Sequence, residues 1–148
     1  MLWSTDWAWG LPLLVLTVVA HVFAMVQLSE AIVSLARPRD GQRQEGRFTA
    51  AVAFTALGAA CLHGVEAGLW AAVYVSVGAM PDLHDAMLYS LGAITSYGHV
   101  DIYLADRWKL LGAIEAVNGL ILFGLTTAFL FAAIQQVSPI RARRDSRS

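Results

Sequence analysis

Charged residues are scarce in this chain: Asp, Glu, Lys and Arg make up only 14% of its 148 residues, whereas 57% are hydrophobic. One small domain of this length cannot keep so much apolar surface out of water. The composition therefore excludes a water-soluble globular protein and indicates a protein embedded in a lipid bilayer. Nothing in the sequence supports nucleic-acid binding.

Cysteine is nearly absent, and so is the basic region that opens a secretory signal. The single cysteine, Cys61, rules out an intramolecular disulfide and fits a small packing residue within an apolar stretch. The first apolar stretch begins near Trp9 with no Lys or Arg before it, and it is much longer than the ~7–15 apolar residues of a signal peptide. We therefore expect this stretch to be retained as a membrane anchor.

Three stretches are long and apolar enough to cross a bilayer, which takes about 20 residues. They run from Gly10 to Ala36, from Phe48 to Met80 and from Arg107 to Val137. Trp3, Trp7 and Trp9 precede the first stretch, and indole rings suit the membrane–water boundary. Pro12 is expected to fall in the first turn of that helix, where its missing N–H breaks no hydrogen bond.

Basic residues gather in two segments of the chain. The linker 37–47 carries Arg37, Arg39, Arg43 and Arg47, and the tail 138–148 carries Arg141, Arg143, Arg144 and Arg147. Lys and Arg are missing from residues 1–9 and from the connection 81–106. By the positive-inside rule, the linker and the tail are cytoplasmic, while the amino terminus and the connection face outward. The sequence thus predicts a multi-pass protein of a cell membrane, inner or plasma, with a cytoplasmic carboxyl terminus.

The connection 81–106 is longer than two neighbouring helices need. After Pro81, Asp82 is placed to cap a helix, with Asp85 three residues on and apolar residues following at helical spacing. This helix is too short to cross a bilayer. A short helix followed by irregular backbone fits a re-entrant segment, which survives at membrane depth only where it is buried in protein or lines water. Several copies of the chain would then surround an aqueous path.

Two segments carry a resemblance to a known family. LYSLGAITSYGHVDI resembles the pore helix and selectivity filter of the potassium-channel superfamily, whose signature is T-V-G-Y-G-D, and residues 96–101 fall on that hexapeptide with Gly98 and Asp101 identical. NGLILFGLTTAFLF resembles the inner helix of simple bacterial potassium channels, with Gly119 at the hinge-like position. Residues 48–137 as a whole look like the small prokaryotic ion channels that carry an additional amino-terminal span.

The resemblance implies an all-α membrane protein with three transmembrane helices per chain plus a re-entrant pore helix and filter loop. It divides the chain into an N-terminal transmembrane helix 1–36, the linker 37–47, a pore domain 48–137 (outer helix 48–80, pore helix and filter 82–102, inner helix 107–137) and the tail 138–148. It also implies a homotetramer that conducts a monovalent cation such as K⁺ or Na⁺ passively, without catalytic residues or a cofactor. The expected filter residues are Thr95, Ser96, Tyr97, Gly98, His99, Val100 and Asp101.

Two positions of the filter depart from the family signature. Val100 stands where the second glycine is expected, and a β-branched residue in a left-handed conformation costs roughly 1–2 kcal/mol. We therefore expect the outer half of the filter to differ from potassium-channel geometry and the selectivity to be altered or relaxed. His99 replaces a tyrosine, and its ring either packs behind the filter or faces the axis, where it would make conduction sensitive to pH.

Acidic residues flank the expected filter. Asp82, Asp85 and Asp106, together with Asp101, place carboxylates near the outer mouth, where acidic rings concentrate cations. The alternative is that these carboxylates are ordinary solvated loop charges, with Asp82 as a helix cap.

Polar residues also interrupt the apolar spans. Glu115, Asn118, Leu122 and Thr126 recur at helical spacing in the third span and form one stripe, which would line the cavity below the filter together with Gly119. Alternatively, Glu115 packs behind the pore helix and bonds to it.

In the second span His63 and Glu66 lie one turn apart, and the first span offers His21, Gln27 and Glu30. Such groups form an interhelical clasp, because each buried polar group needs a partner, or they ligate a metal ion. Two functions therefore stand beside the channel: a membrane metal-binding protein that uses His21, His63 and Glu66, and a non-conducting oligomer descended from a channel.

Overall fold

The computed structural model describes residues 3–36, 44–98 and 101–145. Within them the chain forms α1 (Trp3–Ala36), α2 (Gln44–Ser76), α3 (Leu83–Ile94), a short 3₁₀ helix η1 (Asp106–Trp108) and α4 (Lys109–Asp145). These described segments contain no β-strand. The protein is therefore all-helical, as the sequence predicts. His99 and Val100 lie outside the described residues.

α1, α2 and α4 are each long and apolar enough to span a membrane. Their apolar portions are Thr5–Ser34, Gly46–Ser76 and Asp106–Gln135. At 1.5 Å per residue, each of these is about 45 Å long, more than the roughly 30 Å of a bilayer's hydrocarbon core. The prediction of a multi-pass membrane protein with three spanning helices is confirmed in these terms.

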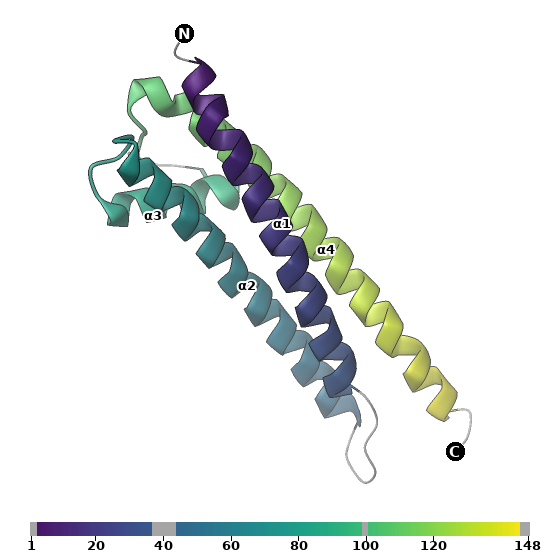
Figure 1. The fold of residues 1–148 in the computed structure, drawn as a ribbon. Helices are drawn as coiled ribbons and strands as arrows, with labels where there is room; N and C mark the ends of the chain where they lie inside the picture. Colours follow the sequence, from purple (N-terminus) through teal and green to yellow (C-terminus); the bar gives the residue numbers. More distant parts are fainter. Residues whose placement is uncertain (1–2, 37–43, 99–100, 146–148) are drawn as a thin grey trace.

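α1 lies between α2 and α4 and packs along both of them (Figure 1). α1 and α4 run in the same direction and α2 runs against them, so the two ends of the chain lie at opposite ends of the bundle (Figure 1). α3 lies across the bundle near the end where α4 begins, and it packs on α2 and α4. The largest buried core, which includes Trp70, Tyr74, Ile94 and Leu111, forms where these helices meet.

α3 starts at the predicted cap. The side chain of Asp82 accepts a hydrogen bond from the backbone N–H of Asp85 at 3.0 Å, which satisfies one of the free donors of the first turn. At its other end α3 reaches α4 at Gly119, where a Cβ atom would collide with the backbone of Ile94. The absence of a side chain at Gly119 is therefore what allows the end of α3 to sit directly on α4.

Several helix boundaries differ from the expected ones, including the start of α2, which lies at Gln44 rather than at Phe48. α1 begins at Trp3 rather than at Gly10, so Pro12 lies inside the helix and not in its first turn. This early start is stabilised by Asp6, whose buried carboxylate accepts the backbone N–H of Leu111 at 3.2 Å and so ties the beginning of α1 to the beginning of α4. α4 begins after η1 and continues past Val137 to Asp145, through most of the segment expected to be a separate tail.

α2 ends at Ser76 rather than at Met80 because a glycine terminates it. Gly78 has a left-handed φ of 69°. The N–H of Ala79 donates to the carbonyl of Tyr74 at 2.8 Å, and the N–H of Gly78 donates to that of Val75 at 3.1 Å. These two bonds form a Schellman motif, which satisfies the last carbonyls of the helix and turns the chain away.

Candidate functional site

The expected filter begins as a turn that folds back on the end of α3. The N–H of Ser96 donates to the carbonyl of Ala93 at 3.2 Å, and the N–H of Gly98 donates to that of Gly92 at 3.3 Å. Ser96 and Gly98 both have positive φ, 56° and 86°. Gly98 adopts this conformation at no steric cost, whereas Ser96 carries a strain of about 1–2 kcal/mol. Residues 95–98 are all exposed in the single chain.

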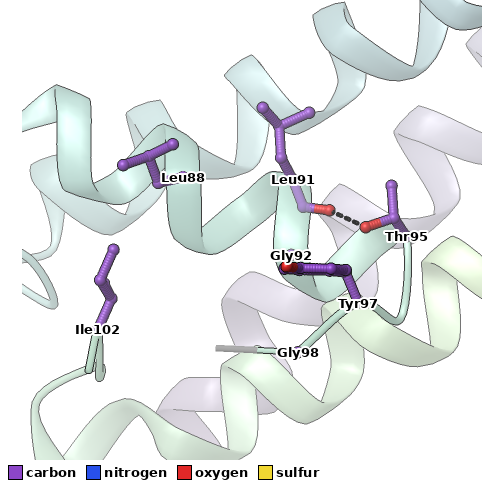
Figure 2. A pocket seen from close by; sticks show the side chains of 7 residues that line it. All are labelled: Leu88, Leu91, Gly92, Thr95, Tyr97, Gly98 and Ile102. Atoms are coloured by element: carbon purple, nitrogen blue, oxygen red, sulfur yellow. Dashed lines mark hydrogen bonds between the residues drawn. The ribbon is translucent and has the colours of Figure 1, made fainter. Parts of the chain in front are cut away.

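A cavity of about 380 Å³ lies between α3 and this turn. Figure 2 shows Leu88 and Leu91 on α3, with Thr95, Tyr97 and Gly98 on the chain that follows it. The Thr95 hydroxyl donates to the carbonyl of Leu91 at 2.5 Å, and the Tyr97 side chain is 87% exposed. The lining is mainly apolar, and Thr95 and Tyr97 supply its polar side-chain groups.

The acidic residues expected at the outer mouth have local roles. Asp82 caps α3, and Asp106 pairs with Lys109 at 2.7 Å on the surface. The His84 ring lies 3.3 Å from the carboxylate of Asp85. Asp101 is exposed and has a positive φ of 70°. Exposed ion pairs of this kind contribute about 0–1 kcal/mol, so none of these contacts prevents the carboxylates from attracting cations.

The polar stripe of α4 faces the interior of its own chain. Its buried members are Glu115, Asn118, Gly119, Leu122 and Thr126. The Tyr74 hydroxyl donates a hydrogen bond to one oxygen of Glu115 at 2.5 Å, and the Ser90 hydroxyl of α3 lies within hydrogen-bond distance of the other. The amide of Asn118 donates to the Thr17 hydroxyl at 2.9 Å. Of the two interpretations of Glu115, the described chain has the one in which it packs behind the short helix; within that chain the stripe does not lie on an exposed face.

Thr126, at the far end of this stripe, belongs to a second polar group. His21 Nδ1 lies 2.8 Å from Glu66 Oε1, and His63 Nδ1 lies 3.2 Å from Glu66 Oε2. The Thr126 hydroxyl oxygen lies 3.0 Å from His21 Nε2 and 3.2 Å from His63 Nε2. All four side chains are buried, and each of the three long helices contributes at least one of them. We call His21, His63, Glu66 and Thr126 the Glu66 cluster, and Tyr74, Ser90 and Glu115 the Glu115 cluster.

Sequence reasoning placed His63 and Glu66 together because they are one turn apart, and it named His21 as a neighbour. It missed the partners on other elements, namely Asp6, Thr17, Tyr74 and Ser90. The spacing of Thr17 and His21, four residues apart on one face of α1, was the available signal for a polar face there. Gln27 and Glu30 lie on exposed positions and take no part in the Glu66 cluster.

Comparison of the chain with protein-family models, with curated proteins and with solved structures finds no match. The function therefore has to be argued from the chemistry and geometry of these sites.

Proposed function

We propose that the chain is one subunit of a homotetrameric pore-loop cation channel, in which residues 95–101 line the ion path. The observation that carries the proposal is the exposed polar turn at the end of α3. The N–H groups of Ser96 and Gly98 are paired with α3, but Ser96, Tyr97 and Gly98 are all exposed and have no cover from their own chain.

The depth of this turn makes its exposure informative. α3 ends against Gly119, ten residues or about 15 Å into α4. We propose that the start of α4 lies at the membrane boundary, which would put the turn about halfway through a 30 Å hydrocarbon core. Irregular polar backbone does not face lipid at such a depth, because each unsatisfied group would cost several kcal/mol. We propose that other copies of the chain, with water between them, provide this cover.

Ions would pass down their electrochemical gradient without any covalent step. Hydroxyl and carbonyl oxygens at 95–98 would replace part of the hydration shell of a monovalent cation such as K⁺ or Na⁺. Asp82, Asp85, Asp101 and Asp106 would raise the cation concentration at the outer mouth. Because the filter reads SYGHVD, we propose altered or relaxed selectivity. The roles of His99 and Val100 remain predictions from the resemblance to potassium channels.

The arginines set the proposed orientation. The linker 37–47 and the end of the chain would lie in the cytoplasm, with the amino terminus and the connection 81–106 outside. The acidic mouth would then face the outer solution.

Cysteine labelling tests whether the turn meets water or lipid. In a Cys61→Ser background, Tyr97→Cys and Phe23→Cys place thiols at two large aromatic positions that are 87% and 68% exposed in the single chain. Phe23 lies on the apolar surface of α1 and serves as the matched control. In proteoliposomes, a charged membrane-impermeant thiol reagent should label Tyr97→Cys and change its K⁺ or Na⁺ flux, and it should leave Phe23→Cys unlabelled.

The channel proposal would be refuted if both positions were labelled equally slowly. It would also be refuted if the protein were monomeric in native lipid. An oligomer that is labelled at position 97 but passes no K⁺, Na⁺ or H⁺ at two pH values would identify the non-conducting relative instead.

A further inference from the structure

The Glu66 cluster is a closed ring of four contacts in the middle of the bundle. Each imidazole faces one carboxylate oxygen of Glu66 through Nδ1 and faces the hydroxyl oxygen of Thr126 through Nε2. The separations lie between 2.8 and 3.2 Å, which is the range of hydrogen bonds. A hydrogen bond at every one of these contacts would need four hydrogens.

The side chains supply too few hydrogens for this ring. A neutral imidazole carries one N–H, a threonine hydroxyl carries one O–H, and an ionised carboxylate carries none. His21, His63 and Thr126 together bring three hydrogens to four contacts. Among the described residues, His63 Nδ1 and Glu66 Oε2 are buried atoms without a hydrogen-bond partner, although they lie 3.2 Å apart. Of the four contacts, the one between His63 Nδ1 and Glu66 Oε2 is therefore the one that lacks a hydrogen bond.

Two hydrogen-bond acceptors that face each other, here Glu66 Oε2 and His63 Nδ1, are unfavourable in a buried site. Glu66 is 1% exposed and His63 is 9% exposed, and both facing atoms are buried, so water does not relieve the repulsion between the lone pairs of Glu66 Oε2 and His63 Nδ1. A buried acceptor left without a partner costs about 1–3 kcal/mol, and more when it is charged. A cation held between the carboxylate and the imidazoles would remove that cost.

The donor atoms suit a particular class of cation. Two imidazole nitrogens and a carboxylate are ligands of Zn²⁺ and of neighbouring divalent transition metals. One donor atom from each of His21, His63 and Glu66 can be chosen so that all three lie within 4.8 Å of one another. We propose that the Glu66 cluster binds a divalent transition metal ion of the Zn²⁺ class through Nδ1 of His21, Nδ1 of His63 and the carboxylate of Glu66.

Thr126 completes this arrangement as an outer partner. When both Nδ1 atoms bind a metal, both Nε2 atoms carry hydrogen, and the two lone pairs of the Thr126 hydroxyl oxygen accept both of these N–H groups. Hydrogen bonds of this kind fix the tautomer and the orientation of metal-bound histidines. The His63 ring also stacks on Phe123, with a centroid separation of 4.6 Å and an interplanar angle of 14°. The rings are thus held in position from α4.

Zinc binding is measured on the untagged, full-length protein in detergent. The protein is stripped with a chelator, equilibrated with Zn²⁺, freed of excess metal and analysed for metal content; Co²⁺ is then titrated as a coloured probe. We expect one Zn²⁺ per chain, visible absorption from bound Co²⁺, and a higher melting temperature with Zn²⁺ than with chelator. Glu66→Gln should abolish all three effects.

A second variant keeps the test informative if Glu66→Gln does not fold. Thr126→Val preserves the shape and all three ligands but removes the acceptor of both Nε2–H groups, and it should weaken Zn²⁺ affinity about 10–100-fold. Two variants should leave Zn²⁺ binding unchanged. His84→Ala removes a member of an exposed group, Asp82, His84 and Asp85, that also offers ligand atoms, and Glu115→Gln alters another buried carboxyl.

Two results would overturn the proposal. The first is that the unchanged protein binds no more Zn²⁺ than Glu66→Gln does and melts at the same temperature with Zn²⁺ as with chelator. The second is melting that depends on pH but not on metal, which would mean that a proton fills the gap in the ring. Because flux plays no part in these measurements, failure of the metal site leaves the channel proposal untouched.

Discussion

Two of the buried carboxyl groups of this bundle, those of Glu66 and Glu115, have nearly the same burial and different neighbours. Glu66 and Glu115 are 1% and 0% exposed. Glu66 faces two imidazoles, whereas Glu115 faces two hydroxyl groups, those of Tyr74 and Ser90. Imidazole nitrogens are strong ligands for transition metals, and neutral hydroxyl groups are poor ones. Equal burial therefore does not give the two carboxyl groups equal roles: the partners decide what each can bind.

The two clusters can also be compared by counting the hydrogens that are available for their hydrogen bonds. The Ser90 hydroxyl lies within bonding distance of Glu115 and also of the Ala67 carbonyl oxygen, at 2.8 Å. Tyr74 and Ser90 thus bring two hydrogens to three contacts, so this cluster is also one hydrogen short. A neutral carboxyl group supplies that hydrogen and leaves no charge in the bundle. The Glu115 cluster closes as a structural joint between α2, α3 and α4, whereas the Glu66 cluster has the atoms to hold a metal ion.

Replacing Glu115 gives the largest expected effect. Glu115→Met fills the space but leaves the buried Tyr74 hydroxyl without its acceptor, and we expect the free energy of unfolding to fall by about 2–4 kcal/mol from the unpaired donor and the lost Ser90 contact. Glu115→Gln keeps both contacts, since its amide donates to Ser90 and accepts from Tyr74, and it should cost less than about 1 kcal/mol. Melting in detergent compares the two. Equal losses from Gln and Met would mean that Glu115 is ionised and that the structural role assigned to its neutral form is wrong.

The contact at Gly119 gives the next largest effect. Gly119→Ala forces a Cβ into the backbone of Ile94, and overpacking of this kind costs about 1–3 kcal/mol. α3 would shift and carry Ser90 away from Glu115. The control is Gly124→Ala on the same helix, where a Cβ meets nothing within 4 Å of the single chain, and helix propensity favours alanine by about 0.5–1 kcal/mol.

Both variants, Gly119→Ala and Gly124→Ala, are tested by measuring the melting temperature with and without Zn²⁺. Gly119→Ala should lower the melting temperature while Zn²⁺ still raises it, because the Glu66 cluster does not involve α3. Loss of the Zn²⁺ response in Gly119→Ala would show that the two clusters are not independent.

Much of this fold could be predicted from the sequence, because span length and apolar content are local properties. The three spans, the short helix and its Asp82 cap follow from runs and spacings along the chain. The ends of α2 and α1 did not follow: Gly78 ends α2 through a backbone motif, and Asp6 extends α1 by capping a different helix. Which side of α4 contacts the other helices depends on the rotation of each helix about its own axis. A single sequence does not determine that rotation. For the same reason Glu115 could be placed on a polar stripe without its partners being known.

The cap of α3 gives the smallest effect, and it separates a structural acid from one that only adds charge. Asp82→Ala removes the acceptor of the Asp85 N–H and should lower the free energy of unfolding by about 1 kcal/mol, whereas Asp82→Asn retains a capping oxygen without the charge and should recover most of that stability. Asp106→Ala breaks an exposed pair with Lys109 and should leave the melting temperature nearly unchanged, because solvent screens the pair. If Asp82 also attracts ions, Asp82→Asn should lower cation flux at low ionic strength and lose that effect in high salt, where screening is strong. The alternative is that Asp82 acts only as a helix cap. In that case the cation flux of Asp82→Ala, Asp82→Asn and Asp106→Ala would fall in the same order as their melting temperatures and would not depend on salt.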